Sequence, residues 1–340
     1  MKSIYDFTLS ELEKYLIELG YKKYNASQVF DWVYKKNITS FSDMSNISKD
    51  LKKHLEENID LNKLEIITKQ SNDSSSKYLL KLVDGNFIEC VLLKHNYGNS
   101  LCISSQVGCN MGCAFCESGR LKKVRDLSLS EMILQIVTVS REENLRIDSV
   151  VIMGIGEPFD NFLVLKRFIE TATNNLALEI GQRHITVSTC GIVPKIKEFA
   201  DLETGVNLAI SLHAPNNKIR DNIMQINRAY KIEEIFEALD YYIKKTNRKV
   251  TIEYILIEGV NDSEENANEL VRLLKGKLMY VNLIPYNETS NFTFKRSSEY
   301  KIQKFYDILK KNNINVIVRK NIASGIDAAC GQLRAKENKL

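Results

Sequence analysis

The stretch that decides the fold is Cys102-Ile103-Ser104-Ser105-Gln106-Val107-Gly108-Cys109-Asn110-Met111-Gly112-Cys113-Ala114-Phe115-Cys116, which holds four of the seven cysteines of the chain. Its last three cysteines form a C-x3-C-x2-C pattern, so three thiols share one tight loop. Structural zinc sites usually draw four ligands from two separated cysteine pairs, and the sequence has no matching second pair. Three thiolates suit an iron–sulfur cluster that keeps one iron open for another ligand. A zinc site and a chance group of buried cysteines are the alternatives.

The length and composition are those of a globular protein. The chain has 340 residues, of which 44% are hydrophobic and 26% charged, which argues against disorder and fibrous repeats. No apolar run approaches the roughly 18 residues that span a bilayer. The start also lacks a secretory signal, so we expect a cytoplasmic protein with reduced thiols and no membrane partner. An odd number of cysteines in so large a chain favours metal or redox chemistry over a disulfide framework.

The net charge of +4 is concentrated at the C-terminal end, where residues 291–340 contain 11 Lys and Arg against 4 Asp and Glu. Such a segment could bind RNA phosphates, but a solvated basic face explains the charge equally well. The run Arg120-Leu121-Lys122-Lys123-Val124-Arg125 has the same two interpretations. Charge alone is therefore consistent with RNA binding and does not establish it.

The first hundred residues change from helical to strand patterns. Residues 8–57 have helical periodicity, whereas 65–68, 77–82 and 87–93 are predicted strands. Asp84-Gly85-Asn86 joins the last two strands and is a strong hairpin signal. We therefore expect a helical accessory domain over 1–60 and a β-hairpin extension over 61–98, followed by a barrel over 99–320 and a C-terminal loop over 321–340.

Short apolar runs and amphipathic stretches alternate after residue 100. The predicted strands are 149–153, 184–188, 206–211, 250–255, 279–284 and 315–318, and the predicted helices include 128–144, 161–174, 231–246, 263–275 and 297–312. This alternation indicates parallel βα units and a full or partial (β/α) barrel. Functional residues of such a barrel lie where the strands end, and the candidate segments there are 154–158, 188–191, 211–213 and 285–287.

The cysteine loop resembles the signature of the radical S-adenosylmethionine superfamily, in which an aromatic residue, here Phe115, precedes the third cysteine. Gly154-Ile155-Gly156-Glu157-Pro158 is similar to the glycine–glutamate motif of that superfamily, which holds the methionine amino group. The resemblance implies an α/β fold with a partial (β/α)6 barrel. It also implies a [4Fe–4S] cluster on Cys109, Cys113 and Cys116, with S-adenosylmethionine chelating the open iron.

A narrower resemblance is to the RNA adenine-C2 methyltransferases of this superfamily. It is carried by Cys102 to Cys109 and by the segments 183–189, 211–216, 282–287 and 326–333. The helical start over 1–60 also resembles the N-terminal domain of this family, which implies that it is an RNA-binding accessory domain. The resemblance implies methylation of C2 of one adenosine in 23S rRNA, at the peptidyl transferase centre, and of the adenosine next to the tRNA anticodon. We expect contacts to S-adenosylmethionine from the strand-end residues Gly156, Glu157, Ser188, Ser211, Leu212, His213 and Asn287.

The same resemblance implies a ping-pong mechanism that uses two S-adenosylmethionine molecules per turnover. Cys330 takes a methyl group from the first, and a deoxyadenosyl radical from the second removes hydrogen from that S-methylcysteine. The resulting carbon radical adds to C2, Glu89 removes the C2 proton, and Cys102 releases the product by forming a disulfide with Cys330. We also expect an electron donor such as flavodoxin or ferredoxin, and we expect the enzyme to be a monomer.

These assignments have alternatives. Cys330 could be a buried structural thiol, Cys102 a fourth cluster ligand and Glu89 a solvent-facing carboxylate, while Cys90 and Cys190 are interpreted as small core residues. For the whole protein, the alternatives are a related enzyme that methylates C8 of the same rRNA adenosine, conferring antibiotic resistance, and an iron–sulfur protein that binds RNA without turnover. The helical N-terminal module and the segment 183–191 favour the C2 enzyme.

Overall fold

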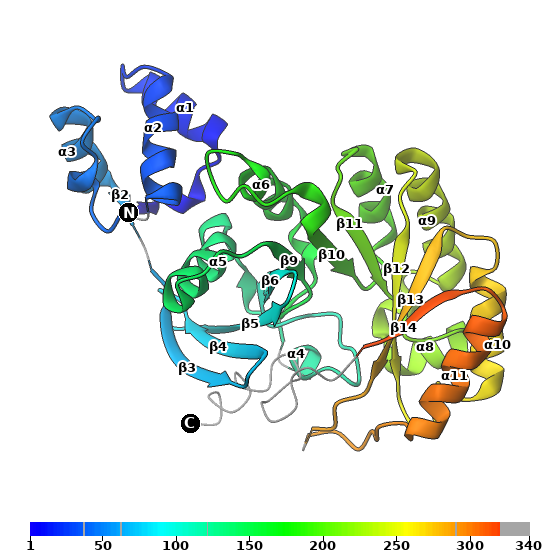
Figure 1. Cartoon of the computed structure of the whole chain (residues 1–340). Coiled ribbons are helices and arrows are strands. Elements are labelled where there is room, and N and C mark those ends of the chain that lie inside the picture. The colour runs from blue at the N-terminus through cyan, green and yellow to red at the C-terminus, as the bar shows by residue number, and fades with distance from the viewer. Residues whose placement is uncertain (37, 62, 121, 290, 320–340) are drawn as a thin grey trace.

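The computed structural model describes residues 1–319 apart from 37, 62, 121 and 290, and a ten-stranded sheet forms its centre (Figure 1). From one edge to the other the strands are β14 (Asn315–Val318), β13 (Met279–Pro285), β12 (Val250–Leu256), β11 (Asn207–Ser211), β10 (Ile185–Thr189), β9 (Ser149–Ile152), β6 (Gly98–Ile103), β5 (Phe87–His95), β4 (Ser75–Lys81) and β3 (Glu65–Ser71).

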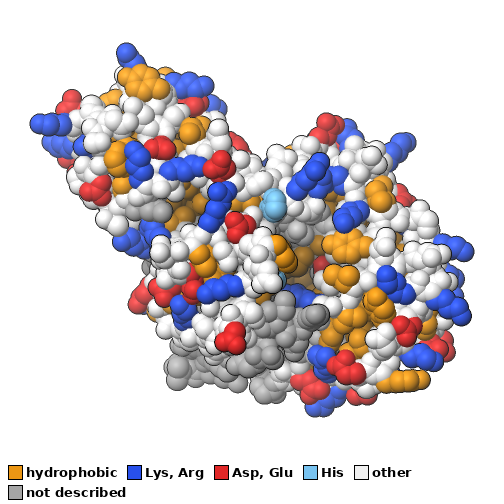
Figure 2. Space-filling model, viewed as in Figure 1, with side chains coloured by type: hydrophobic (Ala, Val, Ile, Leu, Met, Phe, Trp, Pro, Cys, Tyr) orange, Lys and Arg blue, Asp and Glu red, His pale blue; other side chains and the backbone are white. Residues whose placement is uncertain are grey.

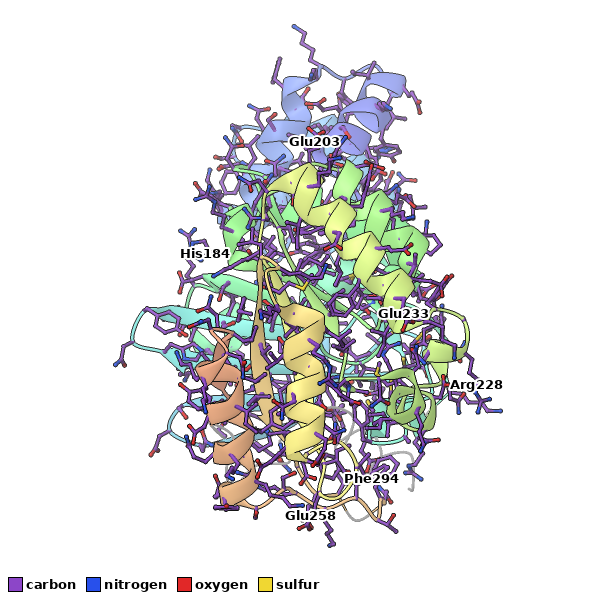
Figure 3. All side chains as sticks on the ribbon, turned by 90° about the vertical axis from the view of Figure 1, so that its right-hand side faces the viewer. His184, Glu203, Arg228, Glu233, Glu258 and Phe294 are labelled. Carbon is purple, nitrogen blue, oxygen red and sulfur yellow. The ribbon has the colours of Figure 1, made fainter. Side chains whose placement is uncertain are left out.

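Every neighbouring pair from β6 to β14 is parallel, and helices connect the strands. Figure 3 looks onto the helices that cover one face of this parallel part. The helices after residue 110 are α4 (Glu117–Arg120), α5 (Leu129–Glu143), α6 (Phe162–Thr173), α7 (Val193–Asp201), α8 (Asn217–Ile223), α9 (Ile232–Thr246), α10 (Glu264–Leu274) and α11 (Glu299–Lys311). The α/β fold class is confirmed, and the two separate edges of the described sheet agree with a partial barrel.

Local sequence explains where these elements begin and why they are buried. Strand β12 is buried along almost its whole length, as expected for a parallel strand covered on both faces. Helix α5 is capped by Ser128, whose side chain accepts a hydrogen bond from the backbone N–H of Glu131, while the side chain of Glu131 accepts from the N–H of Ser128. This reciprocal pair satisfies two N–H groups that would otherwise lack partners.

The predicted hairpin extension adds strands to the same sheet. Strands β3, β4 and β5 are antiparallel, and β5 pairs with β6, the first strand of the parallel part. Asp84-Gly85-Asn86 lies in the turn between β4 and β5, so the hairpin is confirmed. The polar loop between β3 and β4 is short, because β3 ends at Ser71 and β4 begins at Ser75.

The N-terminal segment forms the predicted helical module. It contains α1 (Leu9–Glu18), α2 (Tyr24–Phe30), a π-helix over Asp31–Lys35 and α3 (Lys49–Asn58), and the short strands β1 (Lys2–Ser3) and β2 (Ile59–Asp60) pair across it. Arg167 of α6 donates hydrogen bonds to the carboxylate of Glu11 and the carbonyl oxygen of Asp6. The module is therefore tied to the outside of the barrel. Among the described helices, none has the length and apolar character needed to cross a membrane.

Candidate functional site

The carboxyl ends of the parallel strands meet at one end of the sheet. In Figure 3, Glu258 and Phe294, which follow β12 and β13, lie at the bottom, while Glu203, which precedes β11, lies at the top. The candidate segments that follow β9, β10, β11 and β13 therefore share the lower end. This is the end where α/β folds of this kind place their ligands.

The cysteine loop projects from the first parallel strand and is closed at its base. The short strands β7 (Gln106–Val107) and β8 (Arg125–Asp126) pair antiparallel on either side of the loop. At its tip, the N–H of Ala114 donates to the carbonyl of Ile223 at the end of α8, at 2.9 Å. Gly112 has φ +61°, a conformation that favours glycine. The loop is thus fixed at both its base and its tip.

The three thiols of the loop lie close enough to influence one another. Cys109 is buried, whereas Cys113 and Cys116 are partly exposed. Burial raises the pKa of Cys113 well above its usual value, and the charges of Cys116 and Cys109 raise it further. Burial, followed by the charge of Cys116, raises the pKa of Cys109 to about 12. Thiols in such surroundings need a cation to become thiolates, and bound iron provides one.

The donor set of this loop fits a [4Fe–4S] cluster. Within the described part of the chain, no three Cys, His, Asp or Glu side chains converge around a single ion. Convergence is not required of a cluster, because each cysteine binds a different iron. Met111, Cys113 and Phe115 pack against a small apolar cluster that includes Ile223 and Met224. An apolar shell of this kind limits solvent access to a cluster.

The turn after β9 lies against the strand that leads into the cysteine loop. A Cβ on Gly154 would lie 2.7 Å from the carbonyl oxygen of Ile103, and one on Gly156 would lie 2.6 Å from the Cβ of Gln106. Gly156 also has φ +109°. Both positions thus require glycine, and the turn brings Glu157 next to the cysteine loop.

Glu157 is buried and held by the backbone. Its Oε1 accepts a hydrogen bond from the N–H of Phe159 at 2.9 Å, and its Oε2 accepts from the N–H of Cys190 at 2.8 Å. Burial raises the pKa of this carboxyl, although those hydrogen bonds oppose the change. The side chains of Thr189 and Cys190 also hydrogen-bond to this carboxylate, so an ammonium group would bind by taking the place of one of these side-chain donors.

His213 is a buried neutral imidazole. Its Nδ1 accepts a hydrogen bond from the N–H of Ile255 at 3.1 Å, and its ring packs edge-on against Phe115 of the cysteine loop at 5.1 Å between centroids. Burial, with a smaller contribution from Arg220, lowers its pKa to about 3. The imidazole is therefore neutral near neutral pH and serves to orient its neighbours.

The other predicted cofactor residues also lie at the strand ends. The hydroxyls of Ser188 on β10 and Ser211 on β11 are 3.4 Å apart. Leu212 is fully buried, and its N–H donates to the carbonyl of Glu253. Asn287 follows β13 and is half-buried. The structure therefore brings these residues to the same end of the sheet as the cysteine loop.

Glu89 is not a solvent-facing carboxylate. It lies in β5 with 3% of its surface exposed, and its Oε2 is 2.9 Å from Nζ of the fully buried Lys77. Cys102 is half-buried in the adjacent strand β6. The structure thus places both residues on neighbouring strands. Cys330, the predicted methyl carrier, lies outside the described residues, as does the C-terminal loop 321–340.

The two remaining cysteines are core residues, as predicted. Cys90 is 1% exposed and Cys190 is 5% exposed. Burial raises the pKa of both thiols above the usual value. Neither would ionise near neutral pH, which agrees with their interpretation as small buried apolar groups.

Several buried polar residues at the site were not identified from the sequence. Glu253 of β12 accepts a hydrogen bond from Asn282 of β13 at 2.8 Å, and burial raises its pKa to about 7. Lys77 and the buried Arg220, which donates to the carbonyls of Cys190 and Leu212, were also missed. The sequence does contain a signal for such a residue: Glu253 is a single charged residue inside the apolar run Val250–Leu256.

Many of the basic residues singled out by charge have acidic partners. In the run after the cysteine loop, Lys123 lies 2.8 Å from Asp126 and 2.9 Å from Asp160, and Arg125 lies 2.7 Å from Asp84. The basic C-terminal region shows the same pattern, with ion pairs Lys295–Glu288, Arg296–Glu299, Lys301–Asp262 and Lys304–Glu264. In Figure 2 blue and red side chains are correspondingly interspersed over the visible face, around a hollow.

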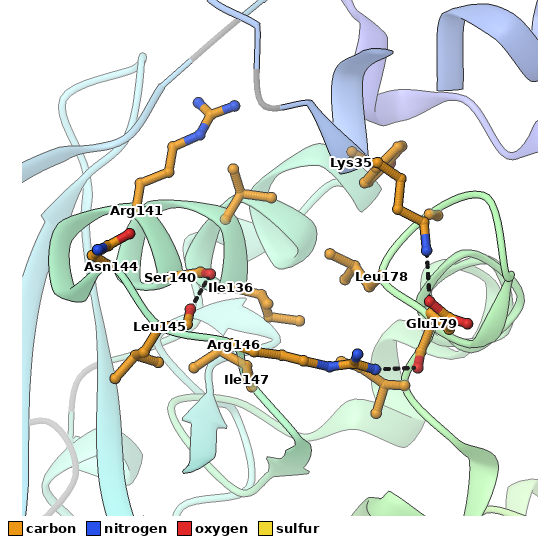
Figure 4. Close-up of a pocket in the computed structure, with 14 residues that line it drawn as sticks. Lys35, Ile136, Ser140, Arg141, Asn144, Leu145, Arg146, Ile147, Leu178 and Glu179 are labelled. Atoms are coloured by element: carbon orange, nitrogen blue, oxygen red, sulfur yellow. Dashed lines mark hydrogen bonds and ion pairs between the residues drawn. The ribbon is translucent and has the colours of Figure 1, made fainter. Parts of the chain in front are cut away.

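A cavity of about 580 Å³ lies elsewhere, between the N-terminal module and the amino end of the barrel (Figure 4). It is bordered by Lys35, Arg146 and Glu179. Lys35 is 2.6 Å from the Glu179 carboxylate, and Arg146 donates to the Glu179 carbonyl at 3.2 Å. Because Arg146 precedes β9, this cavity lies at the opposite end from the cysteine loop and does not belong to the candidate site.

Comparisons with known proteins agree with this geometry. A family model described as "Radical SAM superfamily" matches residues 103–271, and one described as "Ribosomal RNA large subunit methyltransferase N-terminal domain" matches residues 2–61. Relatives from Acholeplasma laidlawii and Enterococcus faecalis, both named "Probable dual-specificity RNA methyltransferase RlmN", are each 52% identical. These matches cover 98% and 99% of this chain and 99% and 97% of the relatives.

A solved structure is similar over the whole chain. The crystal structure of a radical SAM methyltransferase from Sphaerobacter thermophilus matches with a TM-score of 0.91 and 39% sequence identity. The match covers 98% of this chain and 99% of that chain. The two proteins therefore share one fold over nearly their whole length.

Proposed function

Because this chain belongs to the family of radical SAM dual-specificity RNA methyltransferases, we propose that it methylates C2 of one adenosine in 23S rRNA, at the peptidyl transferase centre, and of the adenosine next to the anticodon in tRNAs. The main support is the C-x3-C-x2-C loop at the carboxyl ends of parallel strands, with Gly156 and Glu157 beside it. The N-terminal module, which matches a ribosomal RNA methyltransferase domain, supports an RNA substrate.

The cofactors of the enzyme are a [4Fe–4S] cluster and S-adenosylmethionine. We assign Cys109, Cys113 and Cys116 to the cluster. When bound and reduced, the cluster supplies the electron that cleaves S-adenosylmethionine and so gives access to radical chemistry at an unreactive carbon. Glu157 would accept a hydrogen bond from the methionine ammonium, and Asn287 offers an amide at the end of β13.

The positions of the remaining cofactor contacts favour the sugar and base of S-adenosylmethionine. Ser188 and Ser211 present hydroxyls that can donate to and accept from ribose, and Leu212 and His213 follow on the same strand end. Gly156 leaves room for the cofactor to approach the backbone. His213 remains neutral and shapes the pocket through its hydrogen bond to Ile255.

Three residues of the chain act on the RNA base in this proposal. Cys330 carries the methyl group as S-methylcysteine, having taken it from the first of two S-adenosylmethionine molecules. Glu89 accepts the C2 proton once the carbon is joined to the base. The thiol of Cys102 then attacks the sulfur of Cys330, so that an S–S bond forms as the bond from that sulfur to the transferred carbon breaks. The carbon keeps the bonding pair and takes a proton to become the methyl group, and the unpaired electron left by radical addition would return to the oxidised cluster. We propose that flavodoxin or ferredoxin supplies electrons to a monomeric, cytoplasmic enzyme.

A product analysis tests the proposal. The reconstituted, reduced protein is supplied with a 23S rRNA fragment, or with a tRNA, and methyl-labelled S-adenosylmethionine, and the digested nucleosides are identified. We expect 2-methyladenosine from both RNAs. Detection of 8-methyladenosine would instead support the C8 enzyme. Absence of methylation by a protein with an intact cluster would contradict both, and would favour an RNA-binding protein without turnover.

A further inference from the structure

A fully buried lysine lies beside the proposed base. Lys77 is in β4, its surface is 0% exposed, and its Nζ lies 2.9 Å from Oε2 of Glu89. Lysine and glutamate side chains are almost never fully buried unless they are paired. Removing both charges from water is costly, and an apolar pair of similar volume is often at least as stable. Stability alone therefore gives a weak reason for charges at this position.

The register of the sheet places this pair on the face that carries Cys102. Lys77 is opposite Val91 of β5, and Val91 is opposite Cys102 of β6. Directly opposed residues project from the same face, as do residues two positions apart on one strand. Glu89 precedes Val91 by two positions. Lys77, Glu89 and Cys102 therefore share one face of three adjacent strands.

The backbone of Glu89 is tied to the candidate cofactor site. The hydroxyl of Ser104 donates to the carbonyl oxygen of Glu89 at 2.6 Å and accepts from the N–H of Ile155 at 3.0 Å. Ile155 lies in the glycine–glutamate turn. The carboxylate of Glu89 is held from the other side by Lys77. Both ends of the residue are thus fixed relative to the turn that precedes Glu157.

We propose that Lys77 is a positioning residue that keeps the carboxylate of Glu89 charged and aimed for proton removal from the RNA base. The inference rests on the proposed function, in which Glu89 is the base. In that step the C2–H bond breaks, its electron pair stays with the ring, and the proton joins a Glu89 oxygen. The pair then changes from zero to one positive charge, and loss of one proton to water restores it.

The charge of Lys77 matters because burial favours the neutral form of an isolated carboxyl group, and a neutral carboxyl cannot accept the proton. The ammonium compensates the carboxylate in its resting state. It also makes retention of the extra proton unfavourable, because a protonated, neutral Glu89 no longer compensates the charge of the buried ammonium. Lys77 therefore favours both the resting form of the base and its regeneration.

The test compares Lys77→Met with Lys81→Met in the full-length, reconstituted enzyme under single-turnover conditions. Lys81 lies on the same strand and face, and it pairs with Glu65 at 3.6 Å, but it is exposed. We measure 5′-deoxyadenosine formation, the covalent protein–RNA adduct and the released methylated RNA. For Lys77→Met we expect adduct resolution to slow by about 100-fold, as for loss of a general base, while 5′-deoxyadenosine forms within about twofold of the normal rate. Lys81→Met should behave as the unaltered enzyme.

Two results would overturn the inference. Resolution at the normal rate in Lys77→Met would show that the ammonium is not needed, and an equal fall in radical formation and resolution would indicate general damage. Glu89→Gln tests the role of Glu89 as the base separately from the role of Lys77. If Glu89→Gln resolves the adduct normally, the base assignment and the inference both fail. If Glu89→Gln traps the adduct and Lys77→Met does not, only the inference fails.

The double variant Lys77→Met/Glu89→Gln covers the case in which Lys77→Met does not fold. It contains neither charge of the pair, so no uncompensated carboxylate remains in the core. If Lys77 acts through Glu89, the double variant should resolve the adduct within about twofold of Glu89→Gln alone, because coupled residues are not additive. A further loss of tenfold or more would show that Lys77 acts independently of Glu89. Lys77→Arg, which keeps the charge, should recover most of the rate lost in Lys77→Met.

Discussion

Alanine substitutions at three glycines separate the two ways in which a side chain would destabilise the turn before Glu157, namely backbone strain and a close contact. Two of these glycines lie in that turn, and the third lies in the hairpin. At Gly156 the backbone has φ +109° and a Cβ would lie 2.6 Å from the Cβ of Gln106. At Gly154 the backbone is not in the left-handed region, but a Cβ would lie 2.7 Å from a backbone carbonyl oxygen. Gly85, in the hairpin turn, has φ +85° and open space around it. Gly156 therefore carries both costs, Gly154 carries the close contact alone, and Gly85 carries the backbone strain alone.

The expected magnitudes follow from these environments. Gly85→Ala should destabilise the protein by about 1 kcal/mol through backbone strain. Gly154→Ala should cost about 1–3 kcal/mol, because the backbone of β6 must move to admit the methyl group. Gly156→Ala combines both effects and should cost about 2–6 kcal/mol, which is a large share of the roughly 5–15 kcal/mol that stabilises a typical protein.

Denaturant unfolding measures the stability of the three variants, and equilibrium dialysis with the reconstituted enzyme measures S-adenosylmethionine binding. Because Gln106 accepts a hydrogen bond from the N–H of Glu157 at 2.9 Å, displacement of Gln106 should also move Glu157. We expect Gly156→Ala to weaken binding by at least about tenfold, the equivalent of about 1.4 kcal/mol, and Gly85→Ala to leave it unchanged. If Gly156→Ala is no less stable than Gly85→Ala and binds normally, the close packing against Gln106 does not constrain the site.

Three further outcomes are expected. Cys102→Ala should accumulate enzyme covalently joined to RNA through Cys330, seen as a shifted band on a denaturing gel; normal product release would exclude the resolving role. Glu253 has a folded pKa of about 7 against 4.5 for the free group, so the folded state retains its proton longer and stability should fall by about 3 kcal/mol as the pH rises between those values. Urea unfolding at pH 5 and 8 should show that Glu253→Gln removes this loss. His213→Ala leaves the N–H of Ile255 without its acceptor and should cost about 1–3 kcal/mol at pH 8, again measured by urea unfolding. The loss should be smaller by about 1 kcal/mol at pH 6, because the unfolded state then protonates the imidazole whereas the folded state, in which the pKa of His213 is lowered to about 3, does not.

The sequence predicted the parallel strands well where apolar residues dominate. The strand predicted at 315–318 has those bounds, and the one predicted at 250–255 extends one residue further to Leu256. The sequence did not predict β6, because the residues of Gly98-Asn99-Ser100-Leu101-Cys102-Ile103 are largely small or polar. That segment becomes a strand because β5 and β9 pair with it on both sides. Its conformation is thus set by tertiary pairing, which overrides local preference.

Site residues that are close in sequence could be predicted from spacing, and those joined only by strand register could not. The C-x3-C-x2-C pattern fixes three thiols on one loop in any fold. By contrast, Lys77 meets Glu89 only because the hairpin turn places residues from two strands diagonally opposite each other. Sequence alone left Glu89 as either a base or a solvent-facing group, since period-two alternation does not tell which face of an edge extension becomes buried.

Glu157 illustrates why stability and binding are joined at this end of the sheet. Its two carboxylate oxygens accept N–H groups from Phe159 and Cys190, which belong to the turns after β9 and β10. The hydrogen bonds that hold these turns together therefore also fix the direction of the carboxylate. A ligand ammonium would meet a carboxylate that is already oriented, so little conformational entropy is lost on binding. Because one carboxylate both joins the turns and faces the ligand, a mutation of Glu157 cannot separate stability from binding. Asn287, which is half-buried after β13, is better placed to report on binding alone.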